Sequence, residues 1–365
     1  MEYLGWFAVG FLGIRLLVAL FNLITRPYLP LARAEESLPV SILIPARNEA
    51  ENLPTLLRSL CHSSYKNVEV LVYNDASTDN TAEVAESFST QIPLRVISGT
   101  PLPEGWLGKS HACHRLALEA KGQYLLFLDA DVAIEPNTVS RLVAFAQKRK
   151  LALVSIFPFQ VMETRGERLT VPIMNWILLT LLPLVLVRIS RKVSLSAANG
   201  QLMFFDAAIY RQNQWHSAVK NVRVEDIAIA RLLKRSKNRY RMATLLGRGD
   251  VSCRMYSGYD EAVAGLARSV SAFFGNNLFF MLLFTCFTTL GFVIVFLTLP
   301  WIYGVAYVLA SLATRIFVSV ASKQCALFNV CSMISQHYAF LSMVKQSLVA
   351  KIKGKTQWKG REISV

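Results

Sequence analysis

The chain has 365 residues, of which 53% are hydrophobic and 17% charged, and its mean hydropathy is +0.37. This is too apolar for an ordinary soluble enzyme, and the apolar excess lies at the two ends, so the sequence indicates a membrane protein with a water-soluble middle. The formal net charge of +15 calls for an anionic partner or surface. Because no helix-turn-helix, zinc-finger spacing or RNP-like motif is present, we expect membrane lipid and an anionic substrate, and no nucleic acid.

An apolar stretch opens the chain. Residues 4–25 are long enough to cross a bilayer, and neither end of the stretch has the features of a cleavable signal peptide. Arg26 and Arg33 follow it, so the positive-inside rule places the next domain in the cytosol. Arg15 is costly at mid-bilayer, and we expect it to pack against another span or a lipid headgroup.

From Leu38 on, apolar strands alternate with helices. The expected order is a strand, a loop and a helix, then a second such unit, a third strand, a helix, a fourth strand and another helix. These elements lie in VSILIPARNEAENLPTLLRSL, NVEVLVYNDASTDNTAEVAESF, PLRVIS, residues 110–121, YLLFLDADV and the residues after Pro136. Alternation of this kind predicts an α/β fold with a mostly parallel sheet that helices cover on both faces.

A second apolar stretch, residues 169–189, lies inside this region. It has nearly the length of a membrane span but contains Pro172 and Pro183. A full crossing here would also move the rest of the domain to the other side of the membrane. We therefore expect a hydrophobic or membrane-dipping helix pair that meets a lipid-like molecule.

The C-terminal region is apolar again and then basic. Residues 278–299 and 301–320 form an apolar hairpin broken at Pro300, and residues 326–344 are apolar with interspersed polar groups. The tail, residues 351–365, is basic and should stay cytosolic, which favours two crossings after the soluble domain and an interfacial position for residues 326–344.

Together these features predict a multi-pass protein of the cell membrane whose folded domain is cytosolic. The expected domains are an N-terminal anchor and linker, a cytosolic α/β domain that includes residues 169–189, a C-terminal membrane hairpin with its interfacial helix, and a basic cytosolic tail. Their boundaries are 1–37, 38–272, 273–350 and 351–365.

Carboxylates follow strands or begin helices at four places in the α/β domain. The strand YLLFL runs into Asp129 and Asp131, a spacing that suits one divalent cation, although a strand followed by an acidic turn would look the same. Asp75 is placed to accept hydrogen bonds from a base edge, Asp131 to bind a metal, and Asp226 to deprotonate a hydroxyl group. The four places are Glu49, Asp75, the pair Asp129 and Asp131, and the pair Glu225 and Asp226.

The motifs PARNEAENL, NDASTDNT, LDADV and VEDIAIARLLKR together resemble family 2 glycosyltransferases of the GT-A fold, over roughly residues 40–240. The resemblance implies that Glu49 and Asp75 contact the uracil nucleoside of a UDP-sugar. It places the first carboxylate of the DxD motif, Asp129, against the ribose and beside the metal, and the second, Asp131, on Mg²⁺ or Mn²⁺. It makes Asp226, next to Glu225, the catalytic base of inverting transfer.

A closer resemblance runs nearly from end to end. GKSHAC, CRMYSGYDEAVAGL and WKGREISV are similar to segments of bacterial membrane glycosyltransferases that glycosylate carotenoids, of the diaponeurosporenoate and hydroxychlorobactene type. This implies transfer of a sugar, expected to be glucose, to a lipophilic acceptor such as a carotenoid acid or alcohol. The Q-x-x-R-W motif of processive synthases is absent after Asp226, which favours transfer of one sugar. Trp358 and Arg361 are candidates to cover the diphosphate instead.

Several alternatives stay open. Lys109 either begins a helix in solvent or reaches the nucleotide phosphates. The chain could also be a polysaccharide or glycolipid synthase of the same family. From another class, it could be a non-catalytic membrane scaffold on a transferase fold, although carboxylates at all four places argue against that.

Overall fold

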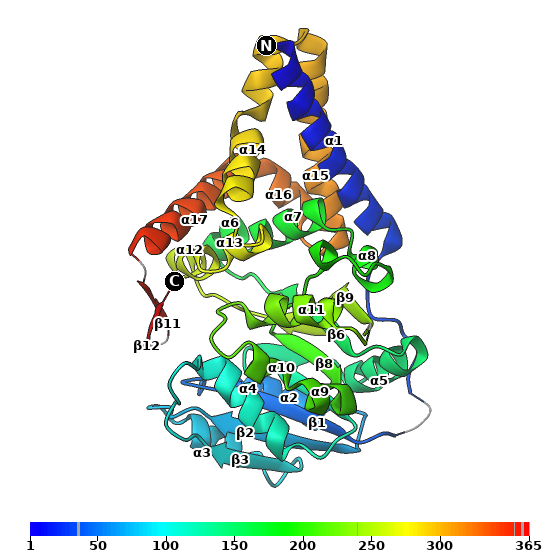
Figure 1. The fold of residues 1–365 in the computed structure, drawn as a ribbon, viewed down its shortest axis with the longest axis vertical. Coiled ribbons are helices and arrows are strands. Elements are labelled where there is room, and N and C mark those ends of the chain that lie inside the picture. Colours follow the sequence, from blue (N-terminus) through cyan, green and yellow to red (C-terminus); the bar gives the residue numbers. More distant parts are fainter. Residues whose placement is uncertain (35–36, 239, 354, 359–360, 365) are drawn as a thin grey trace. The chain divides into compact units, whose positions relative to one another are not determined.

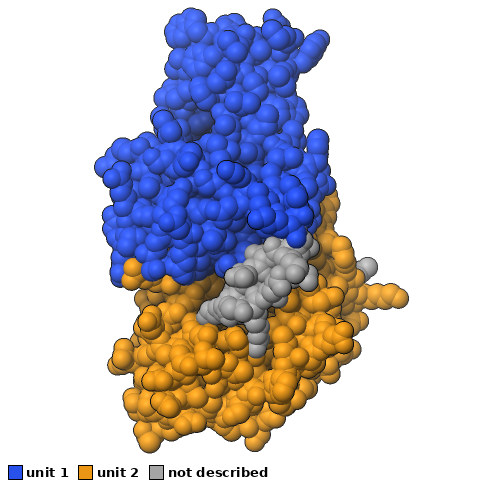
Figure 2. All heavy atoms as spheres, turned by 90° about the vertical axis from the view of Figure 1, so that its left-hand side faces the viewer, with its two compact units in different colours: residues 1–26, 162–183, 255–365 blue, residues 27–161, 184–254 orange. Residues whose placement is uncertain are grey.

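The computed structural model describes residues 1–34, 37–238, 240–353, 355–358 and 361–364, the last two ranges as backbone alone. The chain forms two compact units, distinguished by colour in Figure 2. We call them the helical unit and the sheet unit. The helical unit holds residues 1–26, 162–183 and 255–365, and the sheet unit holds residues 27–161 and 184–254.

These units divide the chain differently from the predicted domains. Residues 162–183 and 255–272, which we expected in the α/β domain, group with the terminal helices, and residues 27–37 group with the sheet. For residues 162–183 the reason is visible in the sequence, because the segment around Pro172 is as apolar as the terminal helices.

A seven-stranded mixed sheet forms the centre of the sheet unit. Its order is β3-β2-β1-β4-β8-β6-β9, and β8 is antiparallel to both of its neighbours, whereas the remaining pairs are parallel. The strands β1 and β4 are buried along nearly their whole length, as expected of strands covered on both faces. The strands are β1 (Val40–Ala46), β2 (Val68–Asn74), β3 (Leu94–Ser98), β4 (Tyr124–Leu128), β6 (Leu153–Phe157), β8 (Leu202–Asp206) and β9 (Met242–Leu246).

Helices pack on this sheet as the alternating pattern predicts. The helix α4 packs against β1, β2 and α10, and Figure 1 shows α4 and α10 on the same side of the strands. The helices of this unit are α2 (Leu53–Cys61), α3 (Thr81–Glu86), α4 (Gly108–Glu119), α5 (Thr138–Arg149), α8 (Leu184–Ile189), α9 (Ala207–Asn213), α10 (Trp215–Ala218) and α11 (Glu225–Arg235), with a 3₁₀ turn at Val193–Leu195.

A second, three-stranded sheet was not predicted. Its order is β5 (Val132–Ile134), β10 (Val251–Cys253) and β7 (Phe159–Gln160). The strand β5 comes directly after Asp131, and β10 is antiparallel to it, with Cys253 opposite Val132. Strands of two or three residues give too short a pattern to recognise in sequence, and this sheet brings a cysteine to the DxD turn.

The helical unit contains the three predicted spans as continuous helices. The helices α1 (Glu2–Thr25), α14 (Leu278–Thr298) and α15 (Trp301–Ala321) are long and apolar enough to cross a membrane. In Figure 1 they run side by side near the N-terminus and diverge toward the other end, where α7 and α16 lie between them. The other elements are α6 (Arg165–Thr170), α7 (Pro172–Leu181), α12 (Tyr259–Ala267), α13 (Val270–Phe273), α16 (Ala326–Cys331), α17 (Met333–Lys353) and a hairpin of β11 (Lys355–Trp358) and β12 (Arg361–Ser364).

Small residues allow the three long helices to approach closely. A Cβ atom added at Gly291 would lie 2.1 Å from the Tyr307 hydroxyl oxygen, and one at Gly5 would lie 2.2 Å from Thr298 Oγ1. The Tyr307 hydroxyl donates to the Phe287 carbonyl at 3.2 Å. Small residues at close helix crossings are typical of membrane bundles, where packing rather than water drives association.

The apolar segment 169–189 is broken as expected. Pro172 begins α7, whose residues are buried from Pro172 to Thr180, and the helix ends at Leu181, before Pro183. A ten-residue helix spans about 15 Å, half the hydrocarbon thickness of a bilayer, so α7 is too short to cross. The helix pair is confirmed, and its contact with lipid stays a prediction.

Candidate functional site

Two loops interlock at the carboxyl ends of β1 and β2. Arg47 donates to the Asp75 carbonyl at 2.6 Å, the Asn48 amide donates to Ser77 Oγ at 3.0 Å, and the Thr78 amide donates to Asn48 Oδ1 at 2.8 Å. Asn48 has a φ of 53°, a conformation that asparagine tolerates better than most residues. These bonds fix the loops that carry the two predicted nucleoside residues.

Glu49 and Asp75 lie on these loops. The Glu49 amide donates to Thr81 Oγ1 at 2.9 Å, and the Glu49 carboxylate accepts from Asn52 at 2.8 Å. Asp75 follows β2 and is 4% exposed. Both therefore sit at the sheet edge where open α/β folds bind ligands.

Lys109 joins two of the four carboxylate places. Its Nζ lies 2.8 Å from Asp129 Oδ2 and 3.2 Å from Glu225 Oε1, and it donates to the Gly200 carbonyl at 3.4 Å. The residue comes from the first turn of α4, whereas its two carboxylate partners follow β4 and open α11. Lys109 thus lies at the start of a helix, but its ammonium group forms ion pairs with protein carboxylates. The prediction of a helix start whose side chain is solvated is therefore wrong.

The two carboxylates near Lys109 stabilise its positive charge. Burial alone would lower the pKa of Lys109, but the carboxylates of Asp129 and Glu225 outweigh it and raise that pKa well above its usual range. The ammonium group therefore stays charged at neutral pH and pairs with both carboxylates.

Asp131 lies beside the small sheet. Its Oδ2 accepts from the Cys253 thiol at 3.3 Å and from Gln201 Nε2 at 3.4 Å, and Gln201 Nε2 also donates to Cys253 Sγ at 2.7 Å. Burial, followed by the neighbouring Asp129 carboxylate, raises the pKa of Asp131 to about 6. Burial likewise raises the pKa of the Cys253 thiol, which stays protonated.

Asp226 is held by backbone amides. Its Oδ2 accepts from the Gly200 amide at 2.9 Å, and its Oδ1 accepts from the Ile227 amide at 2.7 Å. Burial, followed by the neighbouring Glu225 carboxylate, raises the pKa of Asp226 to about 7. A carboxylate with such a pKa is suited to accept a proton near neutral pH.

Gly200 lies between these groups and was not predicted. A Cβ atom at this position would lie 2.8 Å from Lys109 Nζ and 3.0 Å from Glu225 Oε1. Its carbonyl and amide contact Lys109 and Asp226. A lone glycine in SAANGQ gave no sequence signal, because its role depends on side chains that are distant in the chain.

Oxygen atoms suited to a hard cation are present at the DxD turn. Asp131 Oδ1 and Gln201 Oε1 are buried and accept no hydrogen bond from the described side chains or backbone. Carboxylate and amide oxygens are the ligands that Mg²⁺ and Mn²⁺ favour. The described residues contain no group of three or more His, Cys, Asp or Glu side chains placed to hold a metal, so the protein itself offers a partial shell.

The structure brings several of the predicted residues together around Lys109. Lys109 contacts both Asp129 and Glu225, Asp131 lies two residues after Asp129, and Asp226 directly follows Glu225. The Glu49 carboxylate acts on Asp131 through its charge, and Asp75 lies on the loop after β2, where its amide donates to the Ala46 carbonyl at 2.8 Å. The predictions for Trp358 and Arg361 concern side chains outside the described part of the structure.

Residues 41–208 match the family model described as Glycosyl transferase family 2. The chain carries a family 2 glycosyltransferase domain. The matched range includes Glu49, Asp75, Lys109, Asp129 and Asp131 and ends before the Glu225-Asp226 pair. The family predicted from the motifs is therefore confirmed.

Two relatives of this glycosyltransferase domain carry the same name. The chain is 28% identical over 246 residues to the 4,4'-diaponeurosporenoate glycosyltransferase of Staphylococcus haemolyticus, which covers 65% of this chain and 62% of the relative. It is 35% identical over 125 residues to the protein of that name from Staphylococcus aureus, over about a third of each chain. The chain thus spans less than two thirds of the relatives it matches.

A solved glycosyltransferase has a similar fold. The mannosyltransferase PcManGT of Pyrobaculum calidifontis, solved in complex with GDP-Man and Mn²⁺, superposes with a TM-score of 0.57 at 16% identity. The match covers 95% of this chain and 98% of that one. It confirms the predicted GT-A fold, a mixed sheet with flanking helices.

Proposed function

We propose that the protein is a membrane glycosyltransferase that moves one sugar from a UDP-sugar to a lipid-like acceptor, with inversion at the anomeric carbon. The observation that carries the proposal is the cluster in which Lys109 bridges Asp129 and Glu225 beside two carboxyl groups of raised pKa. Such a cluster, at the carboxyl edge of a sheet, supplies both a cation site and a base.

The donor would occupy the strand ends. Glu49 and Asp75 would receive the uracil nucleoside and Asp129 the ribose, while Asp131, with Asp129 and Gln201 nearby, would hold Mg²⁺ or Mn²⁺. When bound, such a cation neutralises the diphosphate and makes UDP a better leaving group. Lys109 lies close enough to Asp129 to reach the same phosphates.

Asp226 would act on the acceptor. A hydroxyl acceptor would lose its proton to Asp226 as its oxygen attacks the anomeric carbon from the face opposite the diphosphate. The bond from that carbon to the diphosphate breaks, and UDP leaves with the electron pair. A carboxylic acid acceptor is already ionised, so Asp226 would only orient it. The names of the relatives support a carotenoid acid or a related terpenoid alcohol as acceptor.

A titration of the detergent-solubilised full chain with UDP tests the donor half. We expect Mn²⁺ to raise UDP affinity at least about tenfold, by about 1.4 kcal/mol, and Asp131→Asn to abolish both this gain and sugar transfer. Glu119→Gln, at an exposed ion pair with Arg95, is the matched control and should behave as the wild type. Metal-stimulated turnover in Asp131→Asn would contradict the assignment.

The acceptor half is tested with two lipid acceptors, one alcohol and one acid, and a radiolabelled UDP-sugar. We expect Asp226→Asn to lose transfer to the alcohol by about a hundredfold or more and to keep most of the transfer to the acid. Equal loss with both acceptors would show that Asp226 does not serve as the base.

A further inference from the structure

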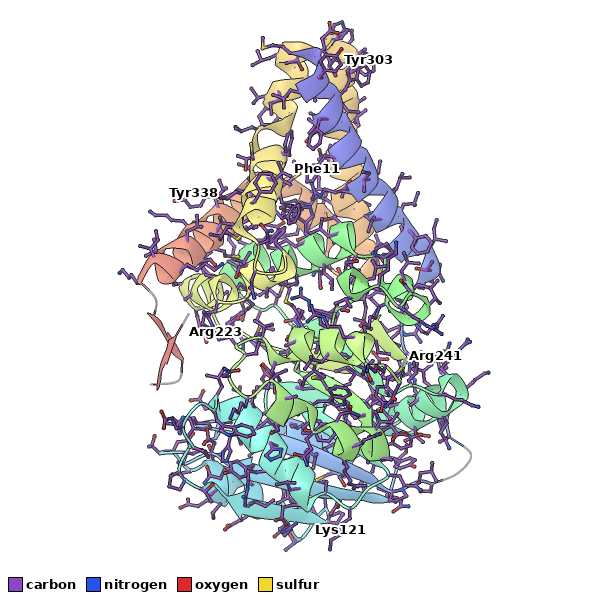
Figure 3. All side chains as sticks on the ribbon, viewed as in Figure 1. Phe11, Lys121, Arg223, Arg241, Tyr303 and Tyr338 are labelled. Carbon is purple, nitrogen blue, oxygen red and sulfur yellow. The ribbon has the colours of Figure 1, made fainter. Side chains whose placement is uncertain are left out.

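Two arginine side chains lie deep in the helical unit. Arg15 of α1 and Arg315 of α15 are each 4% exposed. Both guanidinium groups stack over the indole ring of Trp176 of α7, at 4.7 and 4.3 Å from its centroid, and Arg15 also lies 4.7 Å from the ring of Phe284. The expectation that Arg15 packs against another span is thus confirmed. The Phe11 ring of α1, labelled in Figure 3, lies 5.5 Å from the same guanidinium.

Within the described residues, neither Arg15 nor Arg315 forms an ion pair. The Nη2 atom of Arg15 is buried and has no hydrogen-bond partner in the described chain, and its Nε reaches Thr180 Oγ1 only at 3.4 Å. Stacking on aromatic rings compensates part of the desolvation of a cation, but two cations that share one ring also repel each other.

A polar network holds Arg315 in place. Its Nη1 donates to Gln336 Oε1 at 3.1 Å, and Gln336 is fully buried. Gln336 in turn donates to Asn329 at 2.8 Å and to the Arg168 carbonyl at 3.0 Å. Arg315 is therefore held by neutral groups that leave its charge uncompensated, an arrangement expected of a preorganised anion site.

His337 of α17 does not add a third charge. Its Nε2 lies 2.8 Å from Thr289 Oγ1. Burial, followed by the charges of Arg315 and Arg15, lowers the pKa of His337 to about 4, so the imidazole is neutral at physiological pH. The charges of Arg15 and Arg315 thus lower the pKa of a residue on a third helix, α17.

The depth of the pair restricts its ligand. Counted along the helices at 1.5 Å per residue, Arg15 lies about 15 Å from Thr25 and Arg315 about 9 Å from Ala321, the ends of α1 and α15 that lie on one side of the bundle (Figure 1). Half of a hydrocarbon core is about 15 Å thick. A small inorganic anion would have to leave water to reach this depth, whereas the head of an amphiphile is carried there by its apolar tail.

We propose that Arg15 and Arg315 bind the oxyanion of an amphiphile. The shared chemistry is a singly charged oxyanion on an apolar chain. Its source is either the carboxylate of a lipophilic acid, which would make this a holding site for the proposed acceptor, or the phosphodiester of an anionic phospholipid. The proposal concerns binding alone and stands whether or not the sugar transfer of the preceding section is correct.

The experiment measures binding of a fluorescent polyene fatty acid, and of its uncharged methyl ester, to the full chain in phosphatidylcholine nanodiscs at about pH 8, where the acid is ionised. We expect the wild type to bind the acid at least about tenfold more tightly than the ester. Arg15→Gln and Arg315→Gln should each remove this preference and leave ester binding unchanged. Arg15→Lys, which keeps the charge, should retain most of it.

Replacing phosphatidylcholine by phosphatidylglycerol separates the two sources. If phosphatidylglycerol displaces the acid from the wild type and equally from the exposed-surface control Lys345→Gln, the site takes headgroup phosphate. If the acid stays bound to both, the site takes carboxylates. Lys345→Gln itself should match the wild type in every arm. Equal binding of acid and ester by the wild type overturns the proposal without reference to any variant. The proposal is also overturned if Arg15→Gln and Arg315→Gln have the wild-type Tm and still prefer the acid to the ester as strongly as the wild type does.

Discussion

The candidate site has two pairs of acids, Asp129 with Asp131 and Glu225 with Asp226. Lys109 forms an ion pair with one acid of each pair. Asp129 and Glu225 are paired with it, whereas the pKa values of Asp131 and Asp226 are raised to about 6 and about 7. Neighbouring acids with different environments are a common basis for different roles in one site. Lys109 is thus paired with Asp129 and Glu225, whereas Asp131 and Asp226 are the two acids whose pKa values are raised.

The raised pKa of Asp226 predicts a pH dependence. The base form is the carboxylate, so kcat/KM with an alcohol acceptor should rise with pH, pass half its plateau near pH 7, and fall about tenfold for each unit below that. With an acid acceptor this limb should be absent, because no proton has to be removed. Initial rates across the pH range with both acceptors provide the check, and a limb common to both would assign it to another group.

Gly200 predicts a defect in activity without a defect in folding. In Gly200→Ala the new methyl group would displace the flexible end of Lys109, 2.8 Å away, and weaken its ion pairs. We expect kcat/KM to fall about tenfold, about 1.4 kcal/mol of transition-state stabilisation, with little change in Tm. Gly10→Ala is the control, since nothing lies within 4 Å of its Cβ position. Wild-type activity in Gly200→Ala would show that the Lys109 contacts are dispensable.

Residues of the candidate site could be predicted where a motif names a residue type and not where it does not. Asp129, Asp131 and Asp226 became candidates because carboxylates at strand ends and helix starts have a chemical meaning, and their roles stay predictions. Gly200 and Cys253 were missed, since their roles depend on a close approach and on pairing between three-residue strands. For Lys109 the sequence left two roles open, and only the contacts exclude the solvent-exposed one.

At the scale of elements, the crossing of α14 and α15 depends on Gly291. A methyl group there would collide with the Tyr307 hydroxyl and break its bond to the Phe287 carbonyl. We expect Gly291→Ala to cost about 1–3 kcal/mol, the usual range for overpacking, seen as a lower Tm in detergent. Tyr307→Phe should recover part of the loss in the double variant, because it removes the colliding oxygen.

The control for this crossing is Gly13→Ala in α1, whose Cβ position is open. It should leave the Tm unchanged or raise it slightly, since alanine favours helix more than glycine does. A Tm of Gly291→Ala equal to that of Gly13→Ala would mean that the helices separate easily at this point.

Elements with a long, uniform pattern were predicted well. The strands β1 and β4 and the three long helices follow from continuous apolar runs. The association of α7 with the terminal helices was not predicted, because an apolar run shows that a segment is buried but not which partner buries it. For the same reason the contact of Arg15 with Trp176 was not predicted, because these residues are far apart in the chain.

For the whole molecule, the basic residues after α1 and after α15 predict an orientation. With Arg26 cytosolic and three crossings, Tyr3 should be external and Cys325, just after α15, cytosolic. A membrane-impermeant thiol reagent should label Tyr3→Cys in intact cells and Cys325 only in inverted vesicles. Both positions are exposed, so accessibility does not differ between them. Labelling of Cys325 in intact cells would contradict a cytosolic catalytic domain.

The order in which the chain is synthesised bears on α7. This helix is buried by α1, made before it, and by α15 and α17, which are translated more than a hundred residues later. At ribosomal rates of about 5–20 residues per second, an apolar helix without its partners persists for seconds. During that interval it must be shielded by lipid or by a chaperone, and a nascent chain released before α15 emerges would be a substrate for aggregation or quality-control proteolysis.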